Sequence, residues 1–435
     1  MADRTDWFTN ARFGLFVHWG LYSLAARHEW VQQRERLTDA EYRRYFENFR
    51  ADRFDPGQWA RDAKAAGMRY AVLTTKHHEG FCLWDSDLTD FKATNTPAGR
   101  DLVAEFVEAF RAEGLRVGFY HSLIDWHHPD FTIDGWHPRW DGSADLVELN
   151  AGRDLDRYVD YLHGQVGELL TAHQPDLLWL DFSYADDHRV PVGKGREDWR
   201  ADDLVEMVRK LSPHTLLNDR LDLPGSEDFA TAEEASPHAQ PSADGRPVPW
   251  EACRTLNGSW GYAPGFQEWL DPGQVVRILV DCVSKGGNLL LNIGPDGRGK
   301  FEPRARQMLD AIGSWTTSHA DSIYGAGPVP DVVPPPDCRL TRSGNRLFVH
   351  VFGWQSGTLA CAGLGSRTRY ASMLHDGSEV RFSVVDEDGD LPHLRDAGPP
   401  GALVLHLPAR RPDVPVPVIE LTLDLGDRPV GDTTA

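Results

Sequence analysis

The sequence predicts an α/β protein, a (β/α)8-like (TIM-type) barrel followed by a small C-terminal antiparallel β-sandwich. Three observations carry this prediction. Short apolar runs, typical of strands buried on both faces, alternate with helical segments, which indicates a parallel sheet. Polar and aromatic clusters follow several of these runs, and a barrel brings such strand ends together at one mouth. A proline-rich segment then precedes alternating, β-like runs, which indicates a second domain.

The barrel segments have recognisable boundaries. Asp55, Pro56 and Gly67 are typical of the cap, first position and stop of one helix. Thr38 and Glu41 fit a capping box at another. The expected barrel strands lie within residues 13–20, 70–75, 117–120, 177–180, 215–218 and 288–293. The expected helices are residues 55–67, 101–114, 154–173, 199–211, 272–285 and 301–318. Residues 221–249 read as irregular.

The length of 435 residues is sufficient for two domains. We expect a catalytic barrel over residues 1–325, a Pro-rich linker over 326–336 and a β-sandwich over 337–435. The sandwich prediction depends on runs such as RLFVHVF and VIELTL, which alternate or are rich in β-branched residues. Its length of about a hundred residues is common for such sandwiches.

Composition restricts the kinds of binding partner and the cellular compartment that we expect. The net charge of −21 argues against nucleic acid or an anionic membrane as a partner. No apolar run is long enough to span a bilayer, and no export signal is visible at the N-terminus. The five cysteines are odd in number and widely spaced, which favours free thiols in a reducing compartment. We therefore expect a cytoplasmic protein, which is either a monomer or a homo-oligomer.

One acid stands out at the end of a predicted strand. The apolar run Leu177–Leu180 ends on Asp181, and α/β barrels keep their chemistry at the carboxyl ends of their strands. The alternative is that Asp181 only caps the next element or ends the strand in a turn. This segment alone leaves both interpretations open.

The other acids, histidines and arginine near predicted strand ends fit three functions. A metal-dependent hydrolase would use histidine and aspartate, but no ligand set has zinc spacing. A glycoside hydrolase would use one carboxylate as nucleophile and one carboxylic acid as proton donor. A non-catalytic carbohydrate-binding barrel would need neither carboxylate. The 15 tryptophans favour a sugar-binding pocket, because flat aromatic faces pack against sugar rings. We expect no metal and no cofactor.

Several motifs carry a family resemblance. The chain resembles the α-L-fucosidases of glycoside hydrolase family 29, and the matching segments occur in family order over essentially the whole predicted barrel. They are FGLFVHWG (13–20), HEW (28–30), TKHHEGFCLW (75–84), GFYHSLIDWHHP (118–129), LLWLD (177–181), NDR (218–220), WEACRTLNGSWGY (250–262) and LLLNIGPDGRG (289–299). One departure is Glu79, where many relatives have Asp; we expect this change to be harmless.

The resemblance implies a retaining, exo-acting enzyme that removes terminal α-L-fucosyl residues from oligosaccharides or glycoconjugates. It implies that Asp181 is the nucleophile. The positions expected to bind the sugar are His18, Glu29, Trp30, His77, His78, Tyr120, His121, Trp179, Arg220 and Trp260.

The proton donor stays open between two residues, Glu233 and Glu251, which resemble two positions used in relatives. Glu233 lies in the irregular stretch and could instead be a solvated loop charge. Glu251 could instead be a structural acid that supports the pocket from behind. An irregular loop can deliver an acid from above the sugar ring, so we favour Glu233 slightly.

Overall fold

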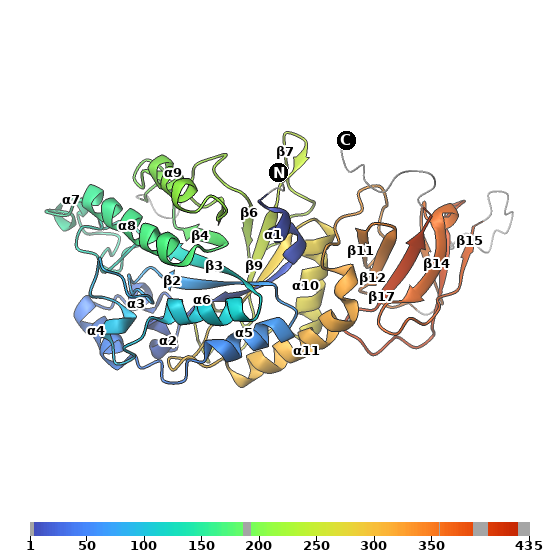
Figure 1. The fold of residues 1–435 in the computed structure, drawn as a ribbon, viewed down its shortest axis with the longest axis horizontal. Helices are drawn as coiled ribbons and strands as arrows, with labels where there is room; N and C mark the ends of the chain where they lie inside the picture. The colour runs from blue at the N-terminus through green and yellow to red at the C-terminus, as the bar shows by residue number, and fades with distance from the viewer. Residues whose placement is uncertain (1–3, 186–192, 356, 386–398, 425–435) are drawn as a thin grey trace.

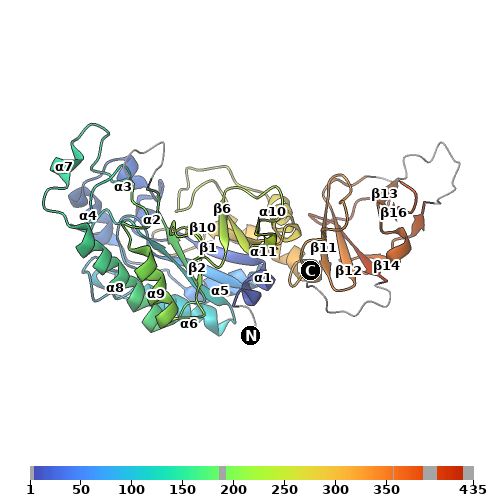
Figure 2. The same ribbon diagram turned by 90° about the horizontal axis from the view of Figure 1, so that it is seen from above.

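The computed structural model describes residues 4–185, 193–355, 357–385 and 399–424. The N-terminal part is a parallel sheet curled into a barrel, and the C-terminal part is a β-sandwich (Figure 1). Figure 2 shows the sandwich on one side of the barrel, beside its last two helices. Both parts of the predicted architecture are therefore confirmed in the described residues.

The barrel contains eight parallel strands in the order β5-β4-β3-β2-β1-β10-β9-β6. Its two outer strands meet at a parallel bridge between Asn218 and Phe229, which joins the ends of the sheet. The strands are β1 (Phe13–Val17), β2 (Tyr70–Lys76), β3 (Arg116–Ser122), β4 (Leu177–Asp181), β5 (Leu216–Leu217), β6 (Ala230–Glu233), β9 (Trp250–Thr255) and β10 (Asn288–Ile293).

Asp228 holds the joint between β5 and β6. Its backbone N–H donates to the Leu217 carbonyl at 2.8 Å, and its carboxylate accepts from the Leu217 N–H, also at 2.8 Å. Arg209 and Arg4 form ion pairs with the same carboxylate at 2.8 and 2.6 Å. Two short strands with few ladder bonds are therefore joined by one buried, doubly paired side chain.

The helices cover the outer face of the barrel. Asp55, Asp101, Asp154 and Asp271 accept the cap hydrogen bonds at the starts of four long helices, and the predicted capping box at Thr38 is confirmed. The helices are α1 (Asp6–Ala11), α2 (Tyr22–Ala25), α3 (Val31–Arg34), α4 (Asp39–Asn48), α5 (Pro56–Ala65), α6 (Leu102–Ala112), α7 (Leu146–Leu149), α8 (Leu155–His173), α9 (Ala201–Leu211), α10 (Pro272–Ser284) and α11 (Pro303–His319).

The stretch 221–249 is more regular than the sequence indicated. It contains β6 and a hairpin of β7 (Ser242–Ala243) and β8 (Arg246–Pro247), with no helix between β5 and β9 in this described stretch. The prediction of an irregular segment is therefore wrong for β6. Its sequence, ATAE, is short and lacks the large apolar residues that mark a barrel strand.

Large side chains fill the barrel interior. Successive residues of a strand point to opposite faces, so Leu177 and Trp179 of β4 belong to the inner cluster while Leu178 and Leu180 pack against the helices. Phe16, Tyr70 and Tyr120 are also members of the inner cluster, and all are nearly fully buried. This aromatic filling forms the base on which the site is built.

The C-terminal domain consists of two antiparallel sheets packed over an apolar core. Val329 and Val332, from the predicted linker, pack into this core. The first sheet is β11 (Cys338–Ser343), β12 (Arg346–Val351), β17 (Val418–Leu423) and β14 (Thr368–Met373); the second is β13 (Gly357–Cys361), β16 (Leu403–Leu407) and β15 (Phe382–Val384). Residues 425–435 of the predicted sandwich lie outside the described residues. No described helix is long and apolar enough to cross a membrane.

Candidate active site

A pocket lies at the carboxyl ends of the barrel strands, where the sequence predicted a site. It is a small cavity, with a volume of about 110 Å³. It is lined by Phe16, His18, Trp30, His77, His78, Tyr120, Trp179, Asp181, Phe182, Tyr184, Arg220, Glu233, Cys253 and Trp260. Eight of the ten predicted sugar-binding residues and two of the three predicted catalytic acids therefore line one cavity; Glu29, His121 and Glu251 do not.

Asp181 is the last residue of β4, and its carboxylate is held from two directions. Its Oδ2 accepts from the Tyr120 hydroxyl at 2.8 Å, and its Oδ1 accepts from Arg220 at 3.0 Å. Burial and the neighbouring Asp181 charge raise the pKa of Tyr120, so its hydroxyl stays a donor. Both carboxylate oxygens thus have fixed donors, which sets the orientation of the group in the pocket.

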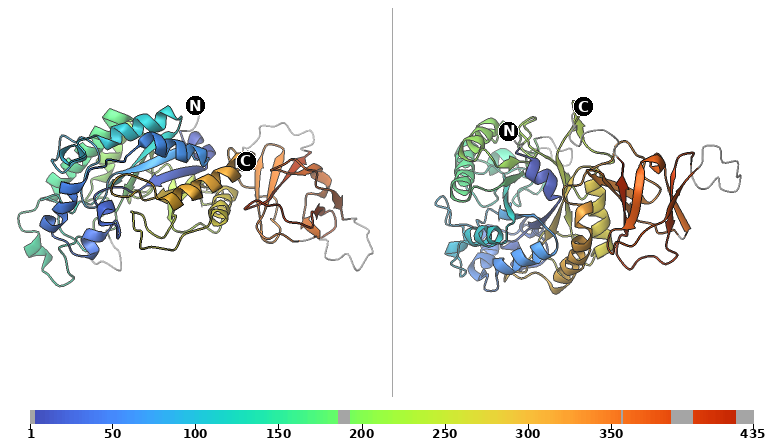
Figure 3. Two further views of the ribbon diagram at one scale, coloured as in Figure 1. Left: turned by 90° about the horizontal axis from the view of Figure 1, so that it is seen from below. Right: turned by 45° about the vertical axis from the view of Figure 1, so that its right-hand side comes forward.

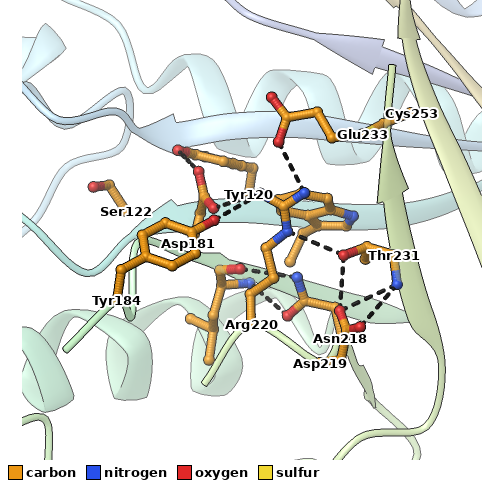
Figure 4. A network of polar contacts seen from close by, with 12 residues as sticks. Tyr120, Ser122, Asp181, Tyr184, Asn218, Asp219, Arg220, Thr231, Glu233 and Cys253 are labelled. Carbon is orange, nitrogen blue, oxygen red and sulfur yellow. Dashed lines mark hydrogen bonds and ion pairs between the residues drawn. The ribbon is translucent and has the colours of Figure 1, made fainter. Parts of the chain in front are cut away.

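Arg220 lies between two carboxylates (Figure 4). One guanidinium nitrogen donates to Asp181, and the other donates to Glu233 at 2.9 Å. Its Nε donates to Thr231 at 3.0 Å, and its guanidinium lies over the Trp179 ring at 4.5 Å. The arginine therefore brings the acid of β4 and the acid of β6 to the same side of the pocket.

Two pocket histidines have defined hydrogen-bond roles. His18 Nδ1 lies 2.7 Å from the Asn292 side-chain oxygen, and His78 Nδ1 lies 2.7 Å from the Ser122 hydroxyl. That hydroxyl already donates to the Ile124 carbonyl at 2.8 Å, so it accepts from His78. Burial lowers the pKa of both imidazoles, which are neutral. Each Nδ1 is thus the protonated nitrogen, and each Nε2 is an acceptor for a hydroxyl donor.

His77 has a buried carboxyl group behind it. Its Nδ1 lies 3.5 Å from Glu79 Oε2, and both side chains are buried. Burial lowers the pKa of His77 to about 3 and raises that of Glu79 to about 8. Both groups are therefore neutral near pH 7, and Glu79 lies beside His77 without lining the pocket.

Aromatic side chains form the walls. Trp30 lies 4.8 Å from the His78 ring and 5.3 Å from Phe182, and Trp260 lies 5.2 Å from His18. Trp260 belongs to the loop after β9, which Asn292 of β10 fixes by donating to the Trp260 carbonyl at 2.7 Å. Rigid apolar faces next to neutral imidazoles match the alternation of apolar and hydroxyl surfaces on a sugar ring.

Glu251 and Glu29 are fully buried outside the pocket lining. Glu251 accepts from the Tyr70 hydroxyl and, at 3.2 Å, from the Trp179 indole, so it lies beneath the pocket base. Glu29 accepts from the Gly261 N–H at 3.0 Å, next to Trp260. The structure thus places both acids where they support aromatic walls, in contrast to Glu233, which lines the cavity.

His121 is also outside the lining, although the resemblance placed it there. It follows Tyr120 on β3, and adjacent strand residues point to opposite faces. Tyr120 therefore points into the pocket, while His121 is buried on the other face beside Thr75 and Trp84. The prediction that His121 contacts the sugar differs from this geometry.

Four residues that line the pocket had no role predicted from the sequence: Phe16, Phe182, Tyr184 and Cys253. Phe16 precedes His18 by two residues, and Cys253 follows Glu251 by two. Residues two apart on a strand share a face, and this spacing was the signal that could have placed Phe16 and Cys253 on the inner face of the barrel. Phe182 has a φ of 82°, a left-handed conformation that no sequence pattern indicated. The Tyr184 hydroxyl accepts a hydrogen bond from the Arg220 guanidinium at 3.3 Å.

In the described residues, no group of three or more histidine, cysteine, aspartate or glutamate side chains is arranged to hold a metal ion. The pocket instead combines two carboxylates, an arginine, neutral histidines and aromatic walls. This combination defines the class of glycoside hydrolases, in which a pair of carboxyl groups flanks the bond that is cleaved.

Comparisons with known proteins identify the family. The model of the α-L-fucosidase family matches residues 2–321. The α-L-fucosidase isoenzyme 1 of Paenibacillus thiaminolyticus is 45% identical, with a TM-score of 0.89 over 97% of this chain and 99% of that chain. The Thermotoga maritima α-fucosidase in complex with fucose is 29% identical, with a TM-score of 0.77 over 95% and 96%. The bovine tissue α-L-fucosidase is 28% identical over 91% of this chain and 86% of its own.

The chain therefore belongs to the α-L-fucosidase family of glycoside hydrolases, as its motifs indicated.

The buried Glu251 makes stability depend on pH. Burial raises its pKa from 4.5 to about 7, so the folded state favours the protonated form. The contribution of protonated Glu251 to the free energy of unfolding is fully present below about pH 4.5 and is lost as the pH rises toward 7. The Glu251→Gln side chain cannot ionise. The difference in unfolding free energy between this variant and the parent should therefore shift by about 2–3 kcal/mol in favour of the variant when the pH is raised from 5 to 8.

Urea unfolding followed by tryptophan fluorescence at both pH values measures this difference. Glu206→Gln, at an exposed position on α9, is the matched control and should show the parental pH dependence. A Glu251→Gln variant with that same dependence would show that Glu251 ionises normally in the fold.

Proposed function

We propose that the protein is an exo-acting, retaining α-L-fucosidase that hydrolyses terminal α-L-fucosyl residues through a covalent glycosyl-enzyme. The observation that carries this proposal is that Arg220 holds Asp181 and Glu233 on one side of a small aromatic pocket. The small size of the pocket supports binding of a single terminal sugar. The bound fucose of the Thermotoga maritima relative supports the identity of that sugar.

In the first step, Asp181 attacks the anomeric carbon and the glycosidic oxygen leaves with a proton from Glu233. Tyr120 and Arg220 orient the attacking carboxylate by donating to its two oxygens. His18 and His78 accept from sugar hydroxyls through Nε2. The products of this step are the free aglycone and a fucosyl ester of Asp181.

In the second step, Glu233 takes a proton from water, which attacks the same carbon and releases fucose with retained configuration. Formation of the ester removes the negative charge of Asp181, so Glu233 is then the remaining carboxylate partner of the Arg220 guanidinium in the pocket.

Hydrolysis of aryl α-L-fucoside tests the function directly. We expect turnover of this substrate, much weaker turnover of aryl β-D-galactoside and α-L-galactoside, and unchanged activity after exhaustive chelation. Activity that chelation removed and zinc or manganese restored would contradict the two-carboxylate mechanism. Binding of fucose without turnover would instead indicate a carbohydrate-binding barrel.

Replacement of Asp181 isolates the nucleophile. Asp181→Gly should lose most of its activity because no carboxylate remains to form the ester. Added azide should restore reaction by occupying the vacated space and should yield β-fucosyl azide of inverted configuration, identified by NMR. Asp219→Gly, which removes a neighbouring acid that hydrogen-bonds Thr231, is the control and should give no azide product. Near-parental turnover by Asp181→Gly would contradict the assignment.

The leaving group distinguishes Glu233 from Glu251. A general acid typically contributes about 10²–10⁴ in rate. Glu233→Ala should lose a factor of this size on an unactivated fucosyl disaccharide, and far less on an aryl fucoside whose leaving group hardly needs a proton. Azide should then give α-fucosyl azide. Glu251→Ala should lose activity equally on both substrates because it disturbs Trp179. The opposite pattern would assign the donor to Glu251.

We also propose a reducing compartment, the cytoplasm. The five cysteines are buried and free of disulfides, which supports this proposal.

A further inference from the structure

A second, larger cavity lies between the barrel and the β-sandwich. Its walls come from α10, from Arg254 of β9, and from residues of the linker and of β11 in the sandwich. The second view in Figure 3 shows α10 between the barrel strands and the sandwich. The volume of this cleft is about 700 Å³, against about 110 Å³ for the catalytic pocket. It therefore has room for more than one sugar unit.

The cleft is cationic in a strongly acidic protein. Its described walls contain Arg254, Arg277, Lys285 and Arg339, but a single carboxylate, Asp281. Asp281 is shared, since it lies 2.6 Å from Lys285 and 2.7 Å from Arg339. Against a net charge of −21, such a local excess of positive charge favours an anion.

Two of these arginines present guanidinium groups that are only partly satisfied. Arg277 donates to the Phe352 carbonyl at 3.0 Å and lies over the Phe352 ring. Arg254 interacts with Glu234, yet its buried Nε has no hydrogen-bond partner among the described residues. A buried N–H without an acceptor is costly, and an oxyanion in the cleft would supply one.

We propose that this cleft binds an acidic sugar, a glycan unit that carries a sulfate or carboxylate group. The excess of guanidinium and ammonium groups selects the oxyanion, and the volume selects an organic anion over a small inorganic one. Naming the ligand as a glycan rests on the proposed function; the anion preference does not. The site is separate from the catalytic pocket and lies on the opposite face of the β6–β9 strand pair.

Calorimetry with matched probes tests the proposal. The probes are sulfated lactose, sialylated lactose, neutral lactose and inorganic sulfate, at constant ionic strength because exposed charges are screened by salt. We expect at least one acidic lactose to bind the cleft at least about tenfold more tightly than lactose or inorganic sulfate. Comparison of the sulfated and sialylated forms identifies the source of the oxyanion.

Three charge-matched variants locate the binding. Arg277→Gln and Lys285→Gln should each weaken binding by about tenfold, the effect of losing one hydrogen bond to a charged group. Arg43→Gln, at an exposed ion pair on α4, removes the same charge elsewhere and should bind like the parent. Thermal unfolding of all three confirms that each is folded.

The measurement is repeated with the catalytic pocket filled by a fucose-like iminosugar. Binding of the acidic lactose should persist, which distinguishes the two sites. Loss of acidic-lactose binding when the iminosugar is present would place the probe in the catalytic pocket and overturn the proposal. Three other results would also overturn it: no binding of either acidic lactose, weakening by Arg43→Gln equal to that by Arg277→Gln, or an affinity for inorganic sulfate equal to that for the acidic lactose. Failure of the iminosugar itself to bind would count against the proposed function. The cleft proposal would then be tested by comparing acidic-lactose binding in Arg277→Gln and in the parent.

Discussion

The ion pairs of Arg220 join the parts of the barrel on which the site depends. Arg220 follows β5, Asp181 ends β4 and Glu233 ends β6, so one guanidinium connects three strands. These strands meet where the barrel has its shortest elements and where Asp228 makes the joint between β5 and β6. The geometry of the two carboxylates is therefore fixed by the same contacts that close the barrel, and loosening of this joint would separate them.

A second constraint is the burial of ionisable groups behind the pocket. Glu29, Glu79 and Glu251 are each almost completely buried, and burial raises the pKa of each carboxyl group. Each contacts a side chain or loop that shapes the pocket. Buried carboxyl groups lower stability when they ionise, so the presence of Glu29 and Glu251 is accounted for better by their hydrogen bonds to the Trp260 loop and to Trp179 than by stability.

Much of this arrangement could be predicted from the sequence. Buried strands, helix caps and the Pro-rich break have local signals, and Asp181 stood at the end of the clearest strand. By contrast, β6 was missed because its four residues are small or polar and its pairing with β9 is a long-range contact. The positions of Glu29, His121 and Glu251 depend on which face each residue occupies, and a motif match does not determine that face.

The alternation of faces along β6 and β9 has a consequence for both cavities. Glu233 and Cys253 are paired across the two strands and line the catalytic pocket. Arg254, the next residue on β9, points the other way and lines the interdomain cleft, where it forms an ion pair with Glu234, the residue that follows the end of β6. Glu234 also donates its N–H to the Cys253 carbonyl at 3.0 Å. A change in the pairing of Arg254 would therefore act on the backbone next to Glu233, which gives the cleft a direct physical connection to the proposed proton donor.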